Sequence, residues 1–119
     1  MLPLAIACAL YFWWRYGTVR VPAGMDTMGA AFPPGALCLI DEHPAALRTG
    51  QVVFVDVDGQ VMVSRVRDVG QDWVTIAHDQ TSARWGDGRG YGRIPDSAVI
   101  GVVLTAFVTQ RARPEGQPR

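Results

Sequence analysis

The stretch QVVFVDVDGQVMVSRVRDV, residues 51–69, decides the fold class of this 119-residue chain. Two valine-rich runs flank Asp58-Gly59, a dipeptide that favours the two-residue turn of a β-hairpin. If that turn closes the hairpin directly, the register places Ser64 opposite Val53. The hydroxyl of Ser64 then lies on an aliphatic face, which it shares with Val53, Val55, Met62 and Val66.

Further short β-branched runs surround this hairpin and are separated by turn residues. Strands are predicted at ALCLID (36–41), DWVTIA (72–77) and SAVIGVVLTAFV (97–108), the last interrupted at Gly101. The polar, glycine-rich segment 78–95 is predicted to be a loop. We therefore expect a small, mainly antiparallel β domain over residues 18–109, followed by a disordered tail at 110–119.

The chain opens with an uncharged run, residues 2–14, that ends in clustered aromatic side chains. This run is shorter than the roughly 20 residues of a spanning helix, but its aromatic end suits a membrane interface and Arg15 can snorkel there. We interpret residues 1–17 as a membrane-anchor segment. A buried soluble helix is one alternative, although the run has no polar face. A cleaved signal peptide is another, although no charged n-region precedes the run.

Composition excludes several kinds of function. The eleven basic residues are all arginine and balance eleven acidic residues, so nothing indicates nucleic-acid binding. Without lysine the chain cannot form a Schiff base, a P-loop lysine contact or a serine–lysine dyad. Cys8 and Cys38 are expected to be buried thiols, and the adjacent residues DEH at 41–43 do not converge on a metal. No cofactor or metal is expected.

Four blocks follow one another in order behind the apolar run. They are TMGAAFPPGALCLID (27–41), RTGQVVFV (48–55), VSRVRDVGQDWVTI (63–76) and DGRGYGRIPDSAVIGVV (87–103). Together, over residues 19–104, they resemble the type I signal peptidases. These are membrane-anchored serine peptidases with a serine nucleophile and a lysine base, and they share their fold with the self-cleaving repressors of the SOS response.

The resemblance implies roles for individual residues. Thr27 falls at the position of the nucleophile, and its backbone N–H would stabilise the oxyanion. Met28 follows it as in the family, while Met25 replaces a helping hydroxyl; both are assigned to binding. Ser64 occupies the position of the lysine base. In the fourth block, a structural brace formed by Asp87 and Arg89 is implied, and there Gly88 replaces the family's serine.

Ser64 cannot take up a proton usefully, so the histidines become alternative bases. Either His43 or His78 could approach Thr27 in the folded chain, but neither occupies a family position, and both are expected to be solvated loop residues. A local grouping of Ser82 with His78 and a nearby aspartate (Asp79 or Asp87) is a further alternative.

Two functions follow from the resemblance. The first is a serine-type peptidase that cleaves exported precursors after small residues, anchored by one segment with its domain on the extracytoplasmic side of the cell membrane. The second is a non-catalytic relative that binds a peptide or a catalytic signal-peptidase partner. The positive-inside rule does not favour export here, because Arg15 and Arg20 follow the apolar run.

Overall fold

The central hairpin forms as the sequence predicts. The computed structural model of the chain describes residues 2–81 and 85–107. Within it, β3 (Val52–Val57) and β4 (Gln60–Val69) pair antiparallel around Asp58-Gly59. These two turn residues have φ values of 53° and 84°, as a type I′ turn requires. The turn therefore fixes the register of the hairpin.

The predicted register is confirmed, since Ser64 lies opposite Val53. Its aliphatic neighbours on that face, Val53, Val55, Met62 and Val66, are all buried. The opposite face of the hairpin is buried as well, at Phe54 and Val63. A hydroxyl on this hairpin is thus enclosed by apolar side chains.

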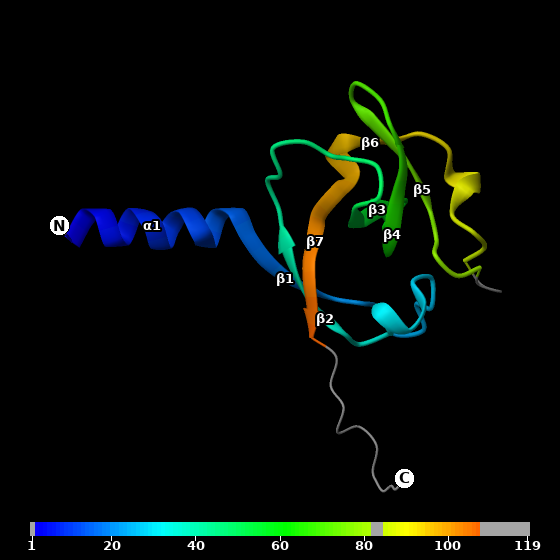
Figure 1. Ribbon diagram of the computed structural model, residues 1–119, viewed down its shortest axis with the longest axis horizontal. Helices are drawn as coiled ribbons and strands as arrows, with labels where there is room; N and C mark the ends of the chain where they lie inside the picture. Colours follow the sequence, from blue (N-terminus) through cyan, green and yellow to red (C-terminus); the bar gives the residue numbers. More distant parts are fainter. Residues whose placement is uncertain (1, 82–84, 108–119) are drawn as a thin grey trace, which may run out of the picture.

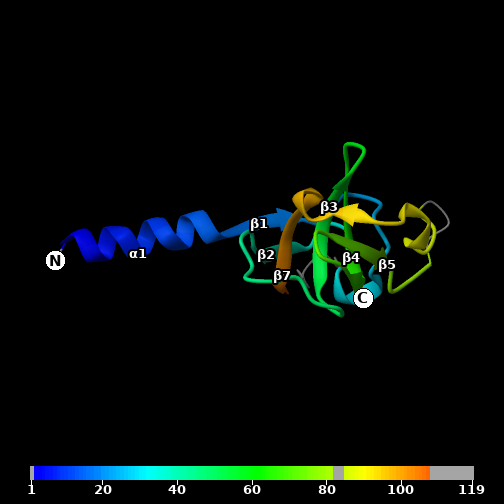
Figure 2. The ribbon, with the colours of Figure 1, turned by 90° about the horizontal axis from the view of Figure 1, so that it is seen from above.

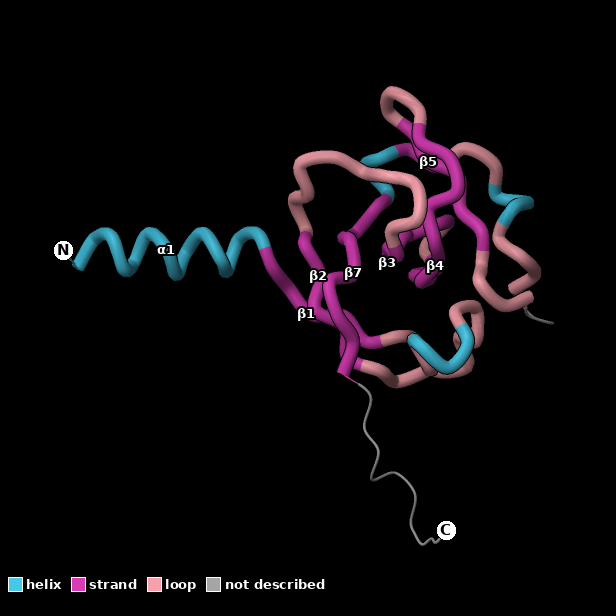
Figure 3. Tube along the Cα trace, viewed as in Figure 1, coloured by secondary structure: helices cyan, strands magenta, loops and turns pink. Residues whose placement is uncertain are grey.

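The mainly β fold is also confirmed. The described residues form one antiparallel sheet of seven strands in the order β1-β2-β7-β3-β4-β5-β6. The sheet curls so that its strands surround a common interior (Figure 3). The remaining strands are β1 (Tyr16–Arg20), β2 (Leu37–Asp41), β5 (Trp73–Ala77), β6 (Ile94–Pro95) and β7 (Val99–Phe107). Short 3₁₀ helices lie at Gly29–Ala31, Arg89–Tyr91 and Asp96–Ala98.

Some expected boundaries shift. The N-terminal helix ends at Arg15, and β1 starts at Tyr16, inside the segment expected to be the anchor, because β1 pairs with β2. Strand β6 forms within the expected loop 78–95 by pairing with β5. Strand β7 runs on through Gly101 with a shift of register against β3 instead of an interruption. The expected tail at 110–119 lies outside the described residues.

Helix α1 (Leu2–Arg15) projects away from the β domain, as two perpendicular views show (Figures 1 and 2). Its last turn is held to β2 by an ion pair of 2.9 Å between Arg15 and Asp41. The ring of Trp14 stacks on His43 at 3.8 Å. Among the described residues, no helix has the length and apolar character needed to cross a membrane.

The core lies between the curled strands and draws residues from most of them. It includes Cys38, whose thiol is buried as predicted. The prediction was wrong for Cys8, which is exposed because α1 projects away from the domain before its last turn. The two thiols thus lie in different parts of the molecule, and both are free.

Candidate functional site

The loop between β1 and β2 holds Thr27 inside the protein. A hydrogen bond of 2.9 Å from the N–H of Val21 to the carbonyl of Ala36 ties the two ends of this loop together. Thr27 is fully buried. Met25 and Met28, which the resemblance assigned to binding, belong to the hydrophobic core, and they fix the loop from both sides of Thr27.

Two hydrogen bonds connect Thr27 to the rest of the site. Its hydroxyl donates to the carbonyl of Val63, at 2.7 Å, on strand β4. Its own carbonyl accepts from the N–H of Gln80, at 2.9 Å, just beyond strand β5. Thr27 therefore lies against the residue that precedes Ser64 and against the residue two positions after His78.

Ser64 and His78 form the central contact of the site. The Ser64 Oγ and the His78 Nδ1 are 2.9 Å apart. Ser64 is fully buried and His78 is only 8% exposed. The expectation that His78 is a solvated loop residue is thus wrong. The position that the resemblance assigns to the base holds a hydroxyl, and that hydroxyl contacts an imidazole.

Strand register explains why the burial of His78 and its contact with Ser64 were not predicted. Arg65 pairs with Ala77, so Ser64 and His78 are the next opposed positions of the two antiparallel strands. A register shift around Arg67 produces this pairing. Without the shift, the register that pairs Val69 with Val74 would continue along the strands and would place His78 opposite Arg65. The sequence did indicate that the strand ends at residue 77, next to His78. It did not reveal the bulge in β4, and that bulge makes Ser64, not Arg65, the residue opposite His78.

Burial favours the neutral form of the His78 imidazole. Removal from water lowers the pKa of His78, and the negative charges of Asp87, Asp26 and Asp79 oppose that effect only in part. The second ring nitrogen, Nε2, is buried and has no hydrogen-bond partner among the described residues. An unpaired buried polar atom is costly, so this nitrogen is the polar atom of the site that the fold alone does not explain.

Charged residues brace the segment around His78. Asp79 forms an ion pair of 2.7 Å with Arg65, and this hydrogen bond lowers the pKa of Asp79. The backbone N–H of His78 donates to the carbonyl of Asp87 at 2.7 Å. The carboxylate of Asp87 accepts from the backbone N–H of Arg89 at 3.0 Å. The implied Asp87–Arg89 brace thus runs through the backbone, and no ion pair joins the two side chains within the described part of the chain.

The other sequence candidates lie elsewhere. His43 is exposed, as predicted, and its ring stacks on Trp14 at the base of α1. Ser82 lies outside the described residues, so its grouping with His78 has no structural account. Over residues 2–81 and 85–107, no group of three or more histidine, cysteine or acidic side chains is arranged to hold a metal ion.

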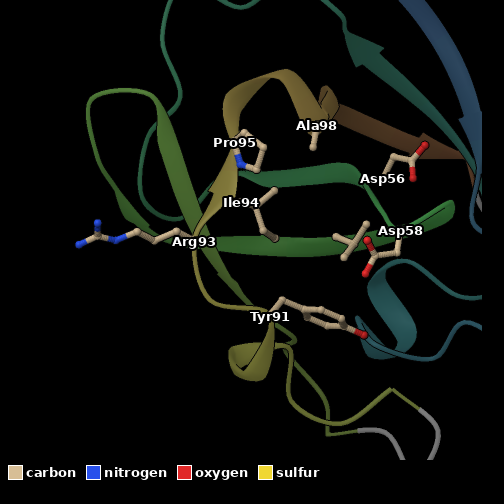
Figure 4. A pocket seen from close by; sticks show the side chains of 8 residues that line it. Asp56, Asp58, Tyr91, Arg93, Ile94, Pro95 and Ala98 are labelled. Carbon is tan, nitrogen blue, oxygen red and sulfur yellow. The ribbon is translucent and has the colours of Figure 1, made fainter.

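A surface pocket of about 330 Å³ lies on a different part of the domain (Figure 4). Asp56, Asp58 and Tyr91 line it, but the side chain of Arg93 extends away from them in the figure. Arg93 instead stacks over the ring of Trp73 at 4.4 Å. None of the predicted catalytic residues lines this pocket, so it is separate from the site at Thr27.

The site combines two hydroxyls with a neutral imidazole, a set of groups that serves nucleophilic catalysis. All three side chains are covered in this structure. A substrate carbonyl can therefore reach them only when covering residues move. No protein-family model matches the chain, and no curated protein matches it either.

Proposed function

We propose that the chain is a signal-peptidase-like, S26-type serine peptidase domain that processes exported precursor proteins. The observation that carries this proposal is the bond of Thr27 to Val63, the residue before Ser64, together with the contact of 2.9 Å between Ser64 and the imidazole of His78. A site that holds a threonine hydroxyl and a neutral imidazole contains the groups needed for nucleophilic hydrolysis of a peptide bond. The four sequence blocks support the same reading, because they assign roles to the same two hydroxyl residues.

The proposed substrate is an extended peptide with small residues before the scissile bond, which would add to the domain as a β-strand. The proposed location is the extracytoplasmic face of a cell membrane, with α1 as the attachment. Helix α1 supports this, because it is 14 residues long and exposes side chains such as Trp13, 85% exposed. Isolated helices shorter than about 12–15 residues are marginal in water, so contact with a membrane surface would stabilise α1.

A second candidate function is favoured by the burial of the site. The hydroxyl of Thr27 is inaccessible, and its proton is donated to a backbone carbonyl, which is not a base. A domain with this closed site would bind a precursor peptide, or a catalytic peptidase subunit, without cleaving it. The two candidates share a peptide-binding domain and differ in whether Thr27 reacts.

The decisive experiment uses the full chain in detergent micelles with a fluorogenic peptide that carries small residues before the scissile bond. Thr27→Val removes the hydroxyl at nearly constant shape, and Thr18→Val makes the same change at an exposed position of β1. We expect cleavage by the unaltered chain, a fall of about 10³-fold or more for Thr27→Val, and no change for Thr18→Val.

Peptide affinity is measured in parallel by fluorescence anisotropy. Binding without cleavage, equal in the unaltered chain and in Thr27→Val, would establish the second candidate instead. Neither cleavage nor binding of such peptides would refute both.

A further inference from the structure

The proposed peptidase needs a proton acceptor, and the residue at the family's base position, Ser64, is not one. We propose that His78 is the general base: its Nε2 takes the proton of Thr27, while the bond between its Nδ1 and Ser64 holds the ring in place. This inference rests on the proposed function and assigns roles within the same site. Thr27 and His78 are then the catalytic residues, and Ser64 is a positioning residue.

The two ring nitrogens of His78 have the contrasting surroundings that such a base requires. Nδ1 is bonded to Ser64 Oγ, whereas Nε2 is buried without a partner among the described residues. If the Nδ1–H donates to Ser64 Oγ, the lone pair of Nε2 is free to accept a proton. In a serine-protease triad a carboxylate bonded to Nδ1 orients the histidine in this way; here the hydroxyl of Ser64 does so.

The space for the imidazole depends on Gly88. A Cβ at position 88 would lie 3.0 Å from His78 Nδ1 and 3.1 Å from its Cε1, which is too close for a side chain without displacing the ring. Gly88 also has a φ of 84°. The departures from the family at Ser64 and Gly88 therefore act together. One removes the long lysine side chain and the other leaves room for a ring from the neighbouring strand.

Two hydrogen bonds tie Thr27 to the segments that carry Ser64 and His78. Its hydroxyl bonds to Val63, next to Ser64, and its carbonyl bonds to Gln80, two residues from His78. Rotation of the Thr27 side chain about its Cα–Cβ bond releases the Val63 carbonyl and frees the hydroxyl proton for transfer. The proposal requires this rotation together with the movement of covering residues that admits a substrate.

The reaction balances with water as the only co-reactant. Thr27 Oγ1 bonds to the carbonyl carbon of the scissile peptide, and its proton passes to His78 Nε2. The C–N bond then breaks, and the amine leaves with that proton. Water attacks the resulting ester and again gives a proton to His78. The return of this proton to Thr27 Oγ1, as the ester C–O bond breaks, releases the carboxylic acid and restores the site.

The charges around the ring suit a base that becomes transiently positive. Carboxylates approach it from three segments: Asp26 beside Thr27, Asp79 after β5, and Asp87 in the loop at Gly88. The charge of one of them, Asp79, is offset by its ion pair with Arg65. Burial favours the neutral imidazole at rest, and the three carboxylates stabilise the imidazolium that forms during the reaction.

The test compares His78→Gln with His43→Gln, the same change at the exposed histidine, in the peptide-cleavage assay with the full chain in micelles. We expect kcat/KM to fall about 10²- to 10⁴-fold for His78→Gln and to stay unchanged for His43→Gln. Ser64→Ala should lower kcat/KM about 3- to 10-fold, which is the effect of one neutral hydrogen bond. Ser64→Thr keeps the hydroxyl and should restore most of that loss.

Two measurements on the unaltered chain test the role of His78 even if a variant fails to fold. The kcat/KM profile should fall on acidification through an apparent pKa below about 6.5. Nitrogen-15 NMR near neutral pH should find hydrogen on Nδ1 of His78 and none on Nε2. The opposite tautomer, or undiminished cleavage by folded His78→Gln, would overturn this inference alone. Absence of cleavage by the unaltered chain would instead refute the peptidase proposal on which the inference rests.

Discussion

The two histidines of this chain lie in opposite surroundings. His78 is buried between β4 and the loop at Gly88, bonds to Ser64 and has a lowered pKa. His43 is exposed at the base of α1, where its ring stacks on Trp14. Each has an acidic neighbour in the sequence, Glu42 before His43 and Asp79 after His78, and both were expected to be solvated. Their difference shows that strand pairing, and not local composition, decides which one becomes part of a site.

The same contrast extends to the two regions that hold them. Around His78, three chain segments meet through buried hydrogen bonds, including those of Thr27. At the base of α1, the contacts are a ring stack and the partly exposed ion pair of Arg15 with Asp41. Exposed contacts contribute little to stability, whereas buried polar groups are costly to leave unpaired. The interior region should therefore respond far more strongly to substitution.

The largest expected effect comes from truncation of the buried histidine. His78→Ala leaves a cavity and an unpaired Ser64 hydroxyl, so the free energy of unfolding should fall by about 2–4 kcal/mol. His43→Ala, the matched surface change, should alter it by no more than about 0.5 kcal/mol. Urea denaturation followed by tryptophan fluorescence measures both. Equal effects of the two substitutions would contradict the contrast between the two regions.

A smaller effect is expected at Thr27. Thr27→Val leaves the buried carbonyl of Val63 without its donor, which should lower the free energy of unfolding by about 1–3 kcal/mol. Thr18→Val on exposed β1 should have almost no effect. Thr27→Ser keeps the donor and should be closer to the unaltered chain. A neutral Thr27→Val would mean that the bond to Val63 contributes nothing to stability.

The smallest effect is a pH dependence of stability. Because the pKa of His78 is lowered in the folded chain, the unfolded chain binds more protons in the window between the two pKa values. The contribution of His78 is complete above about 6.5 and is lost as the pH falls through the lower folded pKa, with a slope of at most about 1.4 kcal/mol per pH unit.

Urea midpoints between pH 7 and pH 5 measure this slope. His78→Gln should flatten it and His43→Gln should leave it unchanged. The paired carboxylates Asp41 and Asp79, whose pKa values are lowered, lose their contributions only below about pH 4, so the two windows are separate. A slope that persists in His78→Gln would assign the titration to another group.

Local sequence signals carried much of the fold. The Asp58-Gly59 turn fixed the hairpin register, and with it the burial of Ser64 opposite Val53. An apolar run located β2 and a run rich in β-branched residues located β7, because strands that are buried need apolar side chains. Strand β6 was missed, since two residues within a polar, glycine-rich segment carry no periodic pattern and form a strand only by pairing with β5.

The features of the candidate site also fall into those that the sequence determined and those that only the fold decided. By itself the sequence determined that Thr27 sits in a loop before a strand and that Ser64 lies among aliphatic residues, because turns and alternation are local properties. Only the tertiary structure brought His78 to Ser64. That contact depends on a bulge around Arg67, which shifts the pairing of β4 with β5 by one residue. A bulge is set by how neighbouring strands pack and twist, so no single segment of sequence specifies it.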